Sequence, residues 1–157
     1  MTDYSETQQF RQLWVWLVLS VCGVGVAVAL VATRGDQSGG AFLLAVAITA
    51  FVFGALLVVI WMLKMTTTVS DTSLKVKFTP VPSGRVFDAR DISSAEPATY
   101  SALKEFGGWG VRWGWGGSRA YNVYGNRGVK ITDNAGKVWM IGTQRPEELA
   151  DAVNSLI

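Results

Sequence analysis

Two long stretches without a single charged residue constrain this chain more than any other feature. Residues 13–33 form an uncharged run of 21 positions, and residues 41–63 form one of 23. At about 1.5 Å per residue, each would span roughly 30 Å as a helix, the thickness of a bilayer's hydrocarbon core. Buried core helices and a cleaved signal peptide are the alternatives, but core helices are rarely so long without a charge, and the leader lacks a basic region. The sequence therefore predicts a transmembrane hairpin, with helices over 13–33 and 41–63 after an N-terminal tail of residues 1–12.

The basic residues flanking the two runs predict the orientation of the hairpin. The connection between the helices carries only Arg34, whereas the outer ends carry four basic residues. Because cytoplasmic flanks are enriched in Lys and Arg, both termini are expected in the cytoplasm. The four basic residues are Arg11, Lys64, Lys75 and Lys77; the expected membrane-interface anchors at the same helix ends are Trp14, Trp16, Trp61 and Lys64.

Small residues repeat every four positions in both runs, as in Gly23/Ala27 and Ala50/Gly54. Such spacing lets the backbones of membrane helices approach closely. It predicts close packing either within the hairpin or in a homo-oligomer, and both remain open at this stage.

Several kinds of chemistry are missing from the sequence. The chain has no histidine, and its single cysteine, Cys22, lies inside the first apolar run. These absences remove histidine-based catalysis, the usual zinc ligand sets and any disulfide within the chain. The glycine-rich segment lacks the third glycine of a dinucleotide fingerprint, and neither apolar run holds the ionisable residue typical of a transport pathway. We therefore expect no enzyme, cofactor or metal, while a carboxylate- or lysine-based enzyme remains an alternative.

The remaining residues, 65–157, read as one small cytoplasmic domain. It holds 11 Lys and Arg against 9 Asp and Glu, a balance that argues against nucleic-acid binding. LKVKF alternates strictly, with Leu74, Val76 and Phe78 on one face, and later segments also have strand composition. Pro97 makes a central strand improbable at its position. RPEELADAVNSLI predicts a terminal amphipathic helix with Pro146 in its first turn.

Short strands followed by one C-terminal helix indicate an α+β membrane protein whose soluble part is a small PH-like β-barrel. The stretch from Phe106 to Leu149, FGGWGVRWGWGG…AYNVYGNRGVKIT…VWMIGTQRPEEL, resembles uncharacterised bacterial membrane proteins that pair two N-terminal helices with a PH-like domain. The similarity is specific over this last third of the chain. It implies the fold, the hairpin and a bacterial inner membrane, and it brings no substrate or catalytic residue.

The segment Gly107–Gly117 holds six glycines and three tryptophans. Strand alternation would place Trp109, Val111, Trp113 and Trp115 on one face and glycines with Arg112 on the other. One interpretation is core packing, in which the indoles meet Leu149, Val153 and Leu156 of the terminal helix. The other is that at least one tryptophan protrudes as an anchor for a membrane or a partner protein, with Trp115 the preferred candidate.

Three functional hypotheses follow. The first is an anchored interaction module that binds a protein partner or a second copy of the chain. The second is sensing of anionic lipid headgroups, and the third is an enzyme using carboxylates or lysine. Arg127 lies in an expected turn, where it is either solvated or presents its guanidinium to an anion. The candidate binding residues are Trp113, Trp115, Arg112, Arg119 and Arg127, with Lys75 and Lys77 added for lipid.

Overall fold

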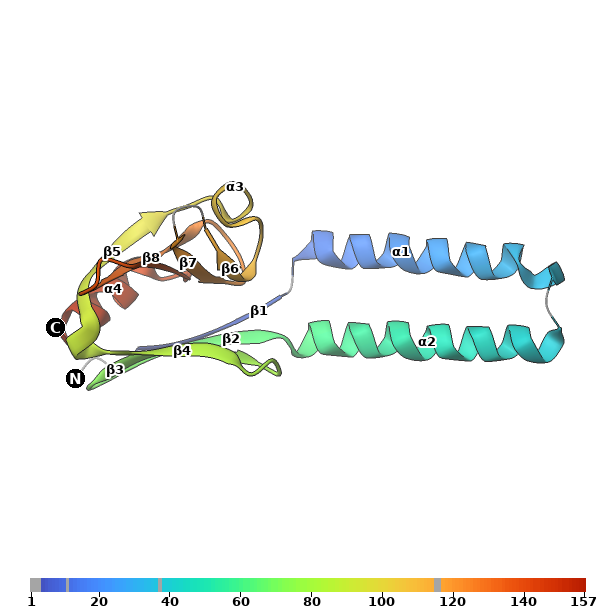
Figure 1. Cartoon of the computed structure of the whole chain (residues 1–157), viewed down its shortest axis with the longest axis horizontal. Helices are drawn as coiled ribbons and strands as arrows, with labels where there is room; N and C mark the ends of the chain where they lie inside the picture. Colours follow the sequence, from blue (N-terminus) through green and yellow to red (C-terminus); the bar gives the residue numbers. More distant parts are fainter. Residues whose placement is uncertain (1–3, 11, 37, 115–116) are drawn as a thin grey trace. The chain divides into compact units, whose positions relative to one another are not determined.

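The computed structural model describes residues 4–10, 12–36, 38–114 and 117–157 (Figure 1). The chain divides into two compact units. One is Arg11–Met62, and the other joins Met1–Phe10 to Leu63–Ile157. The helical segment is therefore inserted into the sequence of the second unit, a division that the predicted boundaries at 12 and 65 did not anticipate.

The first unit is an antiparallel helical hairpin. Helix α1 spans Leu13–Ala32, the short 3-10 helix η1 spans Arg34–Asp36, and α2 spans Gly39–Met62. Neither α1 nor α2 contains a buried residue, and both are long and apolar enough to cross a membrane. Gly23 lies against α2, because a Cβ added there would come 3.1 Å from Phe53 Cζ, whereas Gly25 and Gly54 have open space around them. Only part of the small-residue pattern therefore serves contact between the two helices.

The second unit begins with a four-stranded antiparallel sheet, in the order β1-β2-β3-β4. Strand β1 comes from the expected tail and pairs with β2 from Tyr4↔Val69 to Gln9↔Lys64. Strand β1 was not predicted from the sequence, because two of its inward positions, Glu6 and Gln8, are polar and apolar alternation is therefore missing. The strands are β1 Tyr4–Gln9, β2 Lys64–Ser70, β3 Ser73–Thr79 and β4 Ser83–Asp88.

The other sheet has five strands in the order β5-β8-β9-β7-β6, with β7 and β9 parallel and the other neighbours antiparallel. Pro97 lies in β5, an edge strand, in agreement with the sequence prediction. The elements are η2 Ala89–Asp91, β5 Ile92–Thr99, α3 Ala102–Phe106, β6 Gly110–Trp113, β7 Arg119–Asn122, β8 Arg127–Asp133, β9 Val138–Gly142 and α4 Pro146–Asn154. Helix α4 confirms the predicted terminal helix, with Pro146 in its first turn.

The main core lies between the two sheets and α4. Trp139 of β9 packs edge-on against Phe87 of β4, with ring centroids 5.3 Å apart. Further along β9, the Gly142 carbonyl accepts a hydrogen bond from the Gln8 side chain of β1 at 2.9 Å. Strand β9 therefore crosses the first sheet from its β4 edge to its β1 edge.

The α+β class follows the sequence prediction, but the predicted barrel is not observed, because both sheets are open. Their edges are β1 and β4 in one sheet and β5 and β6 in the other. A smaller core packs beneath α3, away from the main one, and consists of Tyr100, Ala102, Phe106, Ala120 and Met140 with the partly buried Trp109.

Candidate surface around Trp113

The tryptophan-rich segment is not one continuous strand. Gly107 ends α3 in the left-handed conformation with φ 68°, and Gly108 and Gly110 follow with φ 134° and 108°. These glycines supply backbone conformations that other residues rarely adopt, and regular strand geometry begins only at Gly110. The strict alternation of faces predicted from Trp109 onward is therefore wrong.

The two described indoles of this segment have different surroundings. Trp109 is partly buried against the small core, whereas the Trp113 side chain is 67% exposed and its neighbour Val111 is 39% exposed. Core packing of these indoles on Leu149 and Val153 is not observed, because those two residues belong to the main core. Trp115, the preferred candidate for protrusion, lies outside the described residues.

An arginine holds the exposed indole in place. The Arg119 guanidinium lies 3.7 Å from the Trp113 ring centroid and 5.3 Å from that of Trp139. Arg85 of β4 approaches the same Trp139 ring, at 4.0 Å. Cation–π contacts thus link Trp113, Arg119, Trp139 and Arg85, which we call the arginine–tryptophan row. Arg85 was not among the predicted site residues, although its spacing from Phe87 placed both on one face of a strand.

The arginines of this surface have no carboxylate partner among the described residues. Ion pairs in that part of the chain join Arg90 to Asp88, Arg127 to Glu147 and Arg145 to Glu148. Arg112 instead donates from Nε to the Trp109 carbonyl at 2.9 Å. Arg112 of β6 and Arg119 of β7 therefore keep positive charge available on opposite faces of this end of the sheet.

Arg127 does not join the predicted set. Its guanidinium donates to a Glu147 carboxylate oxygen at 2.8 Å, and both side chains are more than half exposed. The pair connects the start of β8 to the first turn of α4. The structure thus brings Arg119 and Trp113 together, leaves Arg112 on the other face of β6, and assigns Arg127 to another contact.

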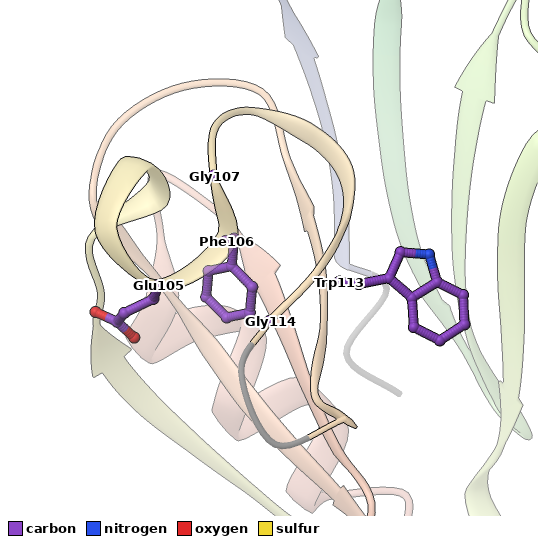
Figure 2. A pocket seen from close by; sticks show the side chains of 5 residues that line it. All are labelled: Glu105, Phe106, Gly107, Trp113 and Gly114. Atoms are coloured by element: carbon purple, nitrogen blue, oxygen red, sulfur yellow. The ribbon is translucent and has the colours of Figure 1, made fainter.

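A pocket of about 320 Å³ opens beside the exposed indole (Figure 2). Its lining comes from the end of α3 and the end of β6. Phe106 and Trp113 both line this pocket, and the Trp113 ring points away from the Phe106 ring. A Cβ added to Gly114 would come 2.6 Å from Phe106 Cε1, so a larger residue at that position would push against this ring. The lining residues are Glu105, Phe106, Gly107, Trp113 and Gly114.

A second hollow, of about 270 Å³, lies along β3 and β4. Its walls include Lys75, Lys77 and Arg85, and no carboxylate lines it among the described residues. Lys77 is paired in register with Thr66 on one side and Gly84 on the other. Thr66 is the fourth residue after the end of α2. We call this hollow the lysine groove.

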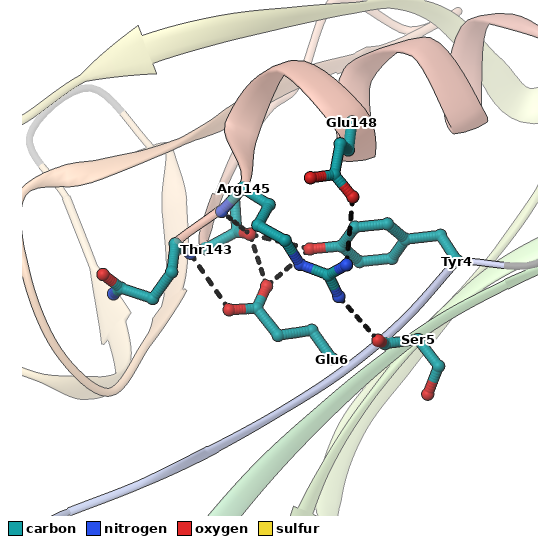
Figure 3. A network of polar contacts seen from close by, with 7 residues as sticks. Tyr4, Ser5, Glu6, Thr143, Arg145 and Glu148 are labelled. Carbon is teal, nitrogen blue, oxygen red and sulfur yellow. Dashed lines mark hydrogen bonds and ion pairs between the residues drawn. The ribbon is translucent and has the colours of Figure 1, made fainter.

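Strand β1 is fastened to the segment before α4 by a polar network (Figure 3). The Tyr4 hydroxyl donates to a Glu6 carboxylate oxygen at 2.5 Å, and the Thr143 hydroxyl donates to the same oxygen. Gln144 donates its backbone N–H to the other Glu6 oxygen at 3.0 Å. Burial, and then the bond to Glu6, raise the pKa of Tyr4 above its usual value. The network secures a strand that the sequence did not predict.

The Arg145 side chain completes this network. It donates to Glu148 at 3.0 Å and to the Ser5 carbonyl at 2.8 Å, and its guanidinium lies 4.8 Å from the Tyr4 ring centroid. The predicted membrane-interface residues lie elsewhere: Trp14 and Trp16 in the first turn of α1, Trp61 at the end of α2, and Lys64 at the start of β2.

No protein-family profile matches the chain, and no curated protein or solved structure gives a significant match to it. The structure itself defines an α+β protein in which two apolar helices interrupt a domain of two open sheets. Within the described ranges, no cluster of three Cys, Asp or Glu side chains could hold a metal ion.

Proposed function

We propose that this chain is a membrane-anchored interaction module that binds a protein partner at the inner face of a bacterial plasma membrane. In this proposal α1 and α2 span the bilayer, and the two-sheet unit is a PH-like domain in the cytoplasm. The same proposal includes membership of the bacterial two-helix family that the sequence resembles.

The connectivity supports a common side for the two segments that flank the hairpin. Gln9, before α1, is paired with Lys64, after α2. If both helices cross the membrane, β1 and β2 must lie on one side of it for this pairing to form. The excess of basic residues at these ends favours the cytoplasmic side.

The observation that carries the proposal is the exposed Trp113 indole stacked on Arg119. Tryptophan and arginine are the residues that most often dominate binding energy in protein interfaces. The Arg119 contact also fixes the ring before any partner arrives, which lowers the entropy lost on binding.

The test is photo-crosslinking in native membranes, with a photoreactive residue at Val111 of the full chain. We expect a discrete crosslinked product that Trp113→Ala removes and that Tyr124→Ala, a change at another exposed aromatic (53%), leaves intact. Absence of any product, or equal yields from the two variants, would overturn the proposal.

A second candidate function, binding of anionic lipid headgroups, is favoured by the lysine groove. The side chains of Lys75 and Lys77 lie on one face of β3, and Lys77 is paired with Thr66, four residues after the end of a proposed membrane helix. In nanodiscs, anionic lipid should slow hydrogen exchange in β3 and β4. Lys75→Gln with Lys77→Gln should abolish that protection, and the control pair Lys104→Gln with Lys137→Gln should keep it. Equal exchange with anionic and zwitterionic lipid would exclude this function.

A further inference from the structure

We infer that β6 is an open sheet edge that takes an extended, acidic segment of the partner protein as an additional strand. This inference rests on the proposed function and names the mode of binding and the chemistry of the partner. It follows from three properties of β6: its lack of cover, its hydrogen-bond register and its charge.

The two edge strands of this sheet differ: the outer edge of β5 is capped by a side chain, whereas that of β6 is not capped by any described residue. In β5, Asn154 of α4 receives the Ala95 N–H at 3.2 Å and donates to the Ala95 carbonyl at 2.8 Å. Pro97 removes another donor from that edge. The Asn154 side chain thus acts as a cap that stops strand addition to β5. In the described part of the chain, no side chain from another element covers β6 in this way.

The register tells which backbone groups of β6 point outward. The Gly114 N–H donates to the Ser118 carbonyl at 2.8 Å, just beyond the pair Trp113↔Arg119. Hydrogen-bonded pairs alternate along an antiparallel ladder, so Arg112 bonds to β7. The N–H and carbonyl groups of Val111 and Trp113 therefore point to the open edge. These same two residues have exposed side chains, so backbone and side chains are both available to an incoming strand.

Charge selects the occupant. An added strand would run directly beside Arg112 on one face, and on the other face beside Trp113, over which Arg119 of β7 places its guanidinium. Neither arginine has a carboxylate partner among the described residues. Acidic side chains on the incoming strand would supply cross-strand partners. A second copy of β6 fits poorly, because the antiparallel register that pairs the outward-pointing groups of Val111 with those of Trp113 would set Arg112 opposite the same residue of that copy. The edge therefore suits a different chain, with acidic residues and an apolar side chain for the Trp113 surface.

The experiment uses the full-length chain in zwitterionic nanodiscs and a library of seven-residue peptides with Glu, Lys, Val, Phe, Thr or Ser at each position. We expect the selected peptides to alternate Glu with apolar residues. Val111→Pro removes an outward N–H that β7 does not use, and it should weaken binding about tenfold. The matched control Val111→Ala keeps the N–H and should stay within about threefold of the original chain.

Hydrogen exchange provides a readout that needs no variant. Bound peptide should protect the amides of Val111 and Trp113 and leave that of Arg112 unchanged, because Arg112 is already bonded to β7. This measurement decides the matter if Val111→Pro fails to fold.

The inference is overturned if no peptide is selected, if selected peptides are basic, if the two Val111 variants bind equally, or if the amides of Val111 and Trp113 gain no protection. Any of these results, together with a Trp113-dependent crosslink in membranes, would reject strand addition and leave the proposed function standing. Loss of the crosslink as well would reject both.

Discussion

The ionisation of the Tyr4 hydroxyl group makes the stability of the folded protein depend on pH. Its pKa is raised above the usual 10 because burial and the Glu6 carboxylate disfavour the phenolate. The folded protein therefore keeps this proton when the unfolded chain has lost it, so the stabilisation is complete below about pH 10 and falls as the pH rises further. Burial raises the pKa of Tyr100 to about 12, which acts in the same direction.

The first prediction is that Tyr4→Phe flattens the alkaline loss of stability. The variant should also be about 1–2 kcal/mol less stable near neutral pH, because the hydrogen bond to Glu6 is lost. Thermal unfolding of the detergent-solubilised chain between pH 7 and 11 measures both effects. Equal alkaline slopes for the variant and the original chain would contradict the assignment.

At the residue scale, the sequence did not predict which tryptophans of the glycine-rich segment are buried. Trp109 and Trp113 share a face in any regular strand, yet one is partly buried and the other is exposed. Gly110, which lies between them, has a positive φ angle and interrupts the regular strand alternation. Glycine adopts positive and negative φ angles with similar ease, so its presence does not reveal which one the chain uses. The sequence alone therefore could not decide whether these glycines form one face of a strand or a turn.

At the scale of single elements, two hydrogen bonds made by the Asn154 side chain join α4 to β5. Replacing Asn154 with Ala would leave the Ala95 N–H and carbonyl without that partner. The second prediction is that Asn154→Ala lowers the free energy of unfolding by about 1–3 kcal/mol. Asp151→Ala, on an exposed position of the same helix, is the control and should change little. Chemical denaturation followed by tryptophan fluorescence measures the free energy of unfolding of both variants. Equal decreases for the two would count against a stabilising role of the Asn154 hydrogen bonds.

Strands β8 and β9 approach so closely at Gly128 that only glycine fits. A Cβ there would lie 2.5 Å from the Ile141 carbonyl oxygen and 3.1 Å from Tyr100 Cε1. The third prediction is that Gly128→Ala costs about 1–3 kcal/mol, because backbone must move. Gly40→Ala, which meets nothing within 4 Å, should unfold as the original chain does. A Gly128→Ala variant of unchanged stability would refute the close approach.

Elements with strong patterns were the predictable ones. The alternation of β3 and the apolar stripe of α4 are both confirmed by burial, since Leu74, Val76 and Leu149 are buried. Strand β1 and the network around Glu6 were not predictable, because polar residues that are buried by hydrogen bonding leave no apolar period. The partner of β1 also lies beyond the whole hairpin in the sequence, where no local pattern could indicate it.

At the scale of the whole molecule, the pairing of β1 with β2 requires both strands to lie on the same side of any membrane that the hairpin crosses. The fourth prediction uses single cysteines in a Cys22→Ser background, probed with a membrane-impermeant thiol reagent. Ser38→Cys, between the helices, should react in intact cells. Ser5→Cys and Thr72→Cys should react only after permeabilisation. Opposite behaviour of Ser5→Cys and Thr72→Cys would contradict the shared side, and an unreactive Ser38→Cys would contradict the spanning hairpin.

Because Gln9 is paired with Lys64, the segment that contains α1 and α2 could be deleted without disrupting the first sheet. Ends that already lie opposite one another in an antiparallel ladder can be joined by a tight turn such as Asn-Gly. If residues 10–63 are deleted and that dipeptide is inserted, we expect β1 and β2 to form an ordinary β-hairpin. The two apolar helices could thus be removed without interrupting the pairing of β1 with β2.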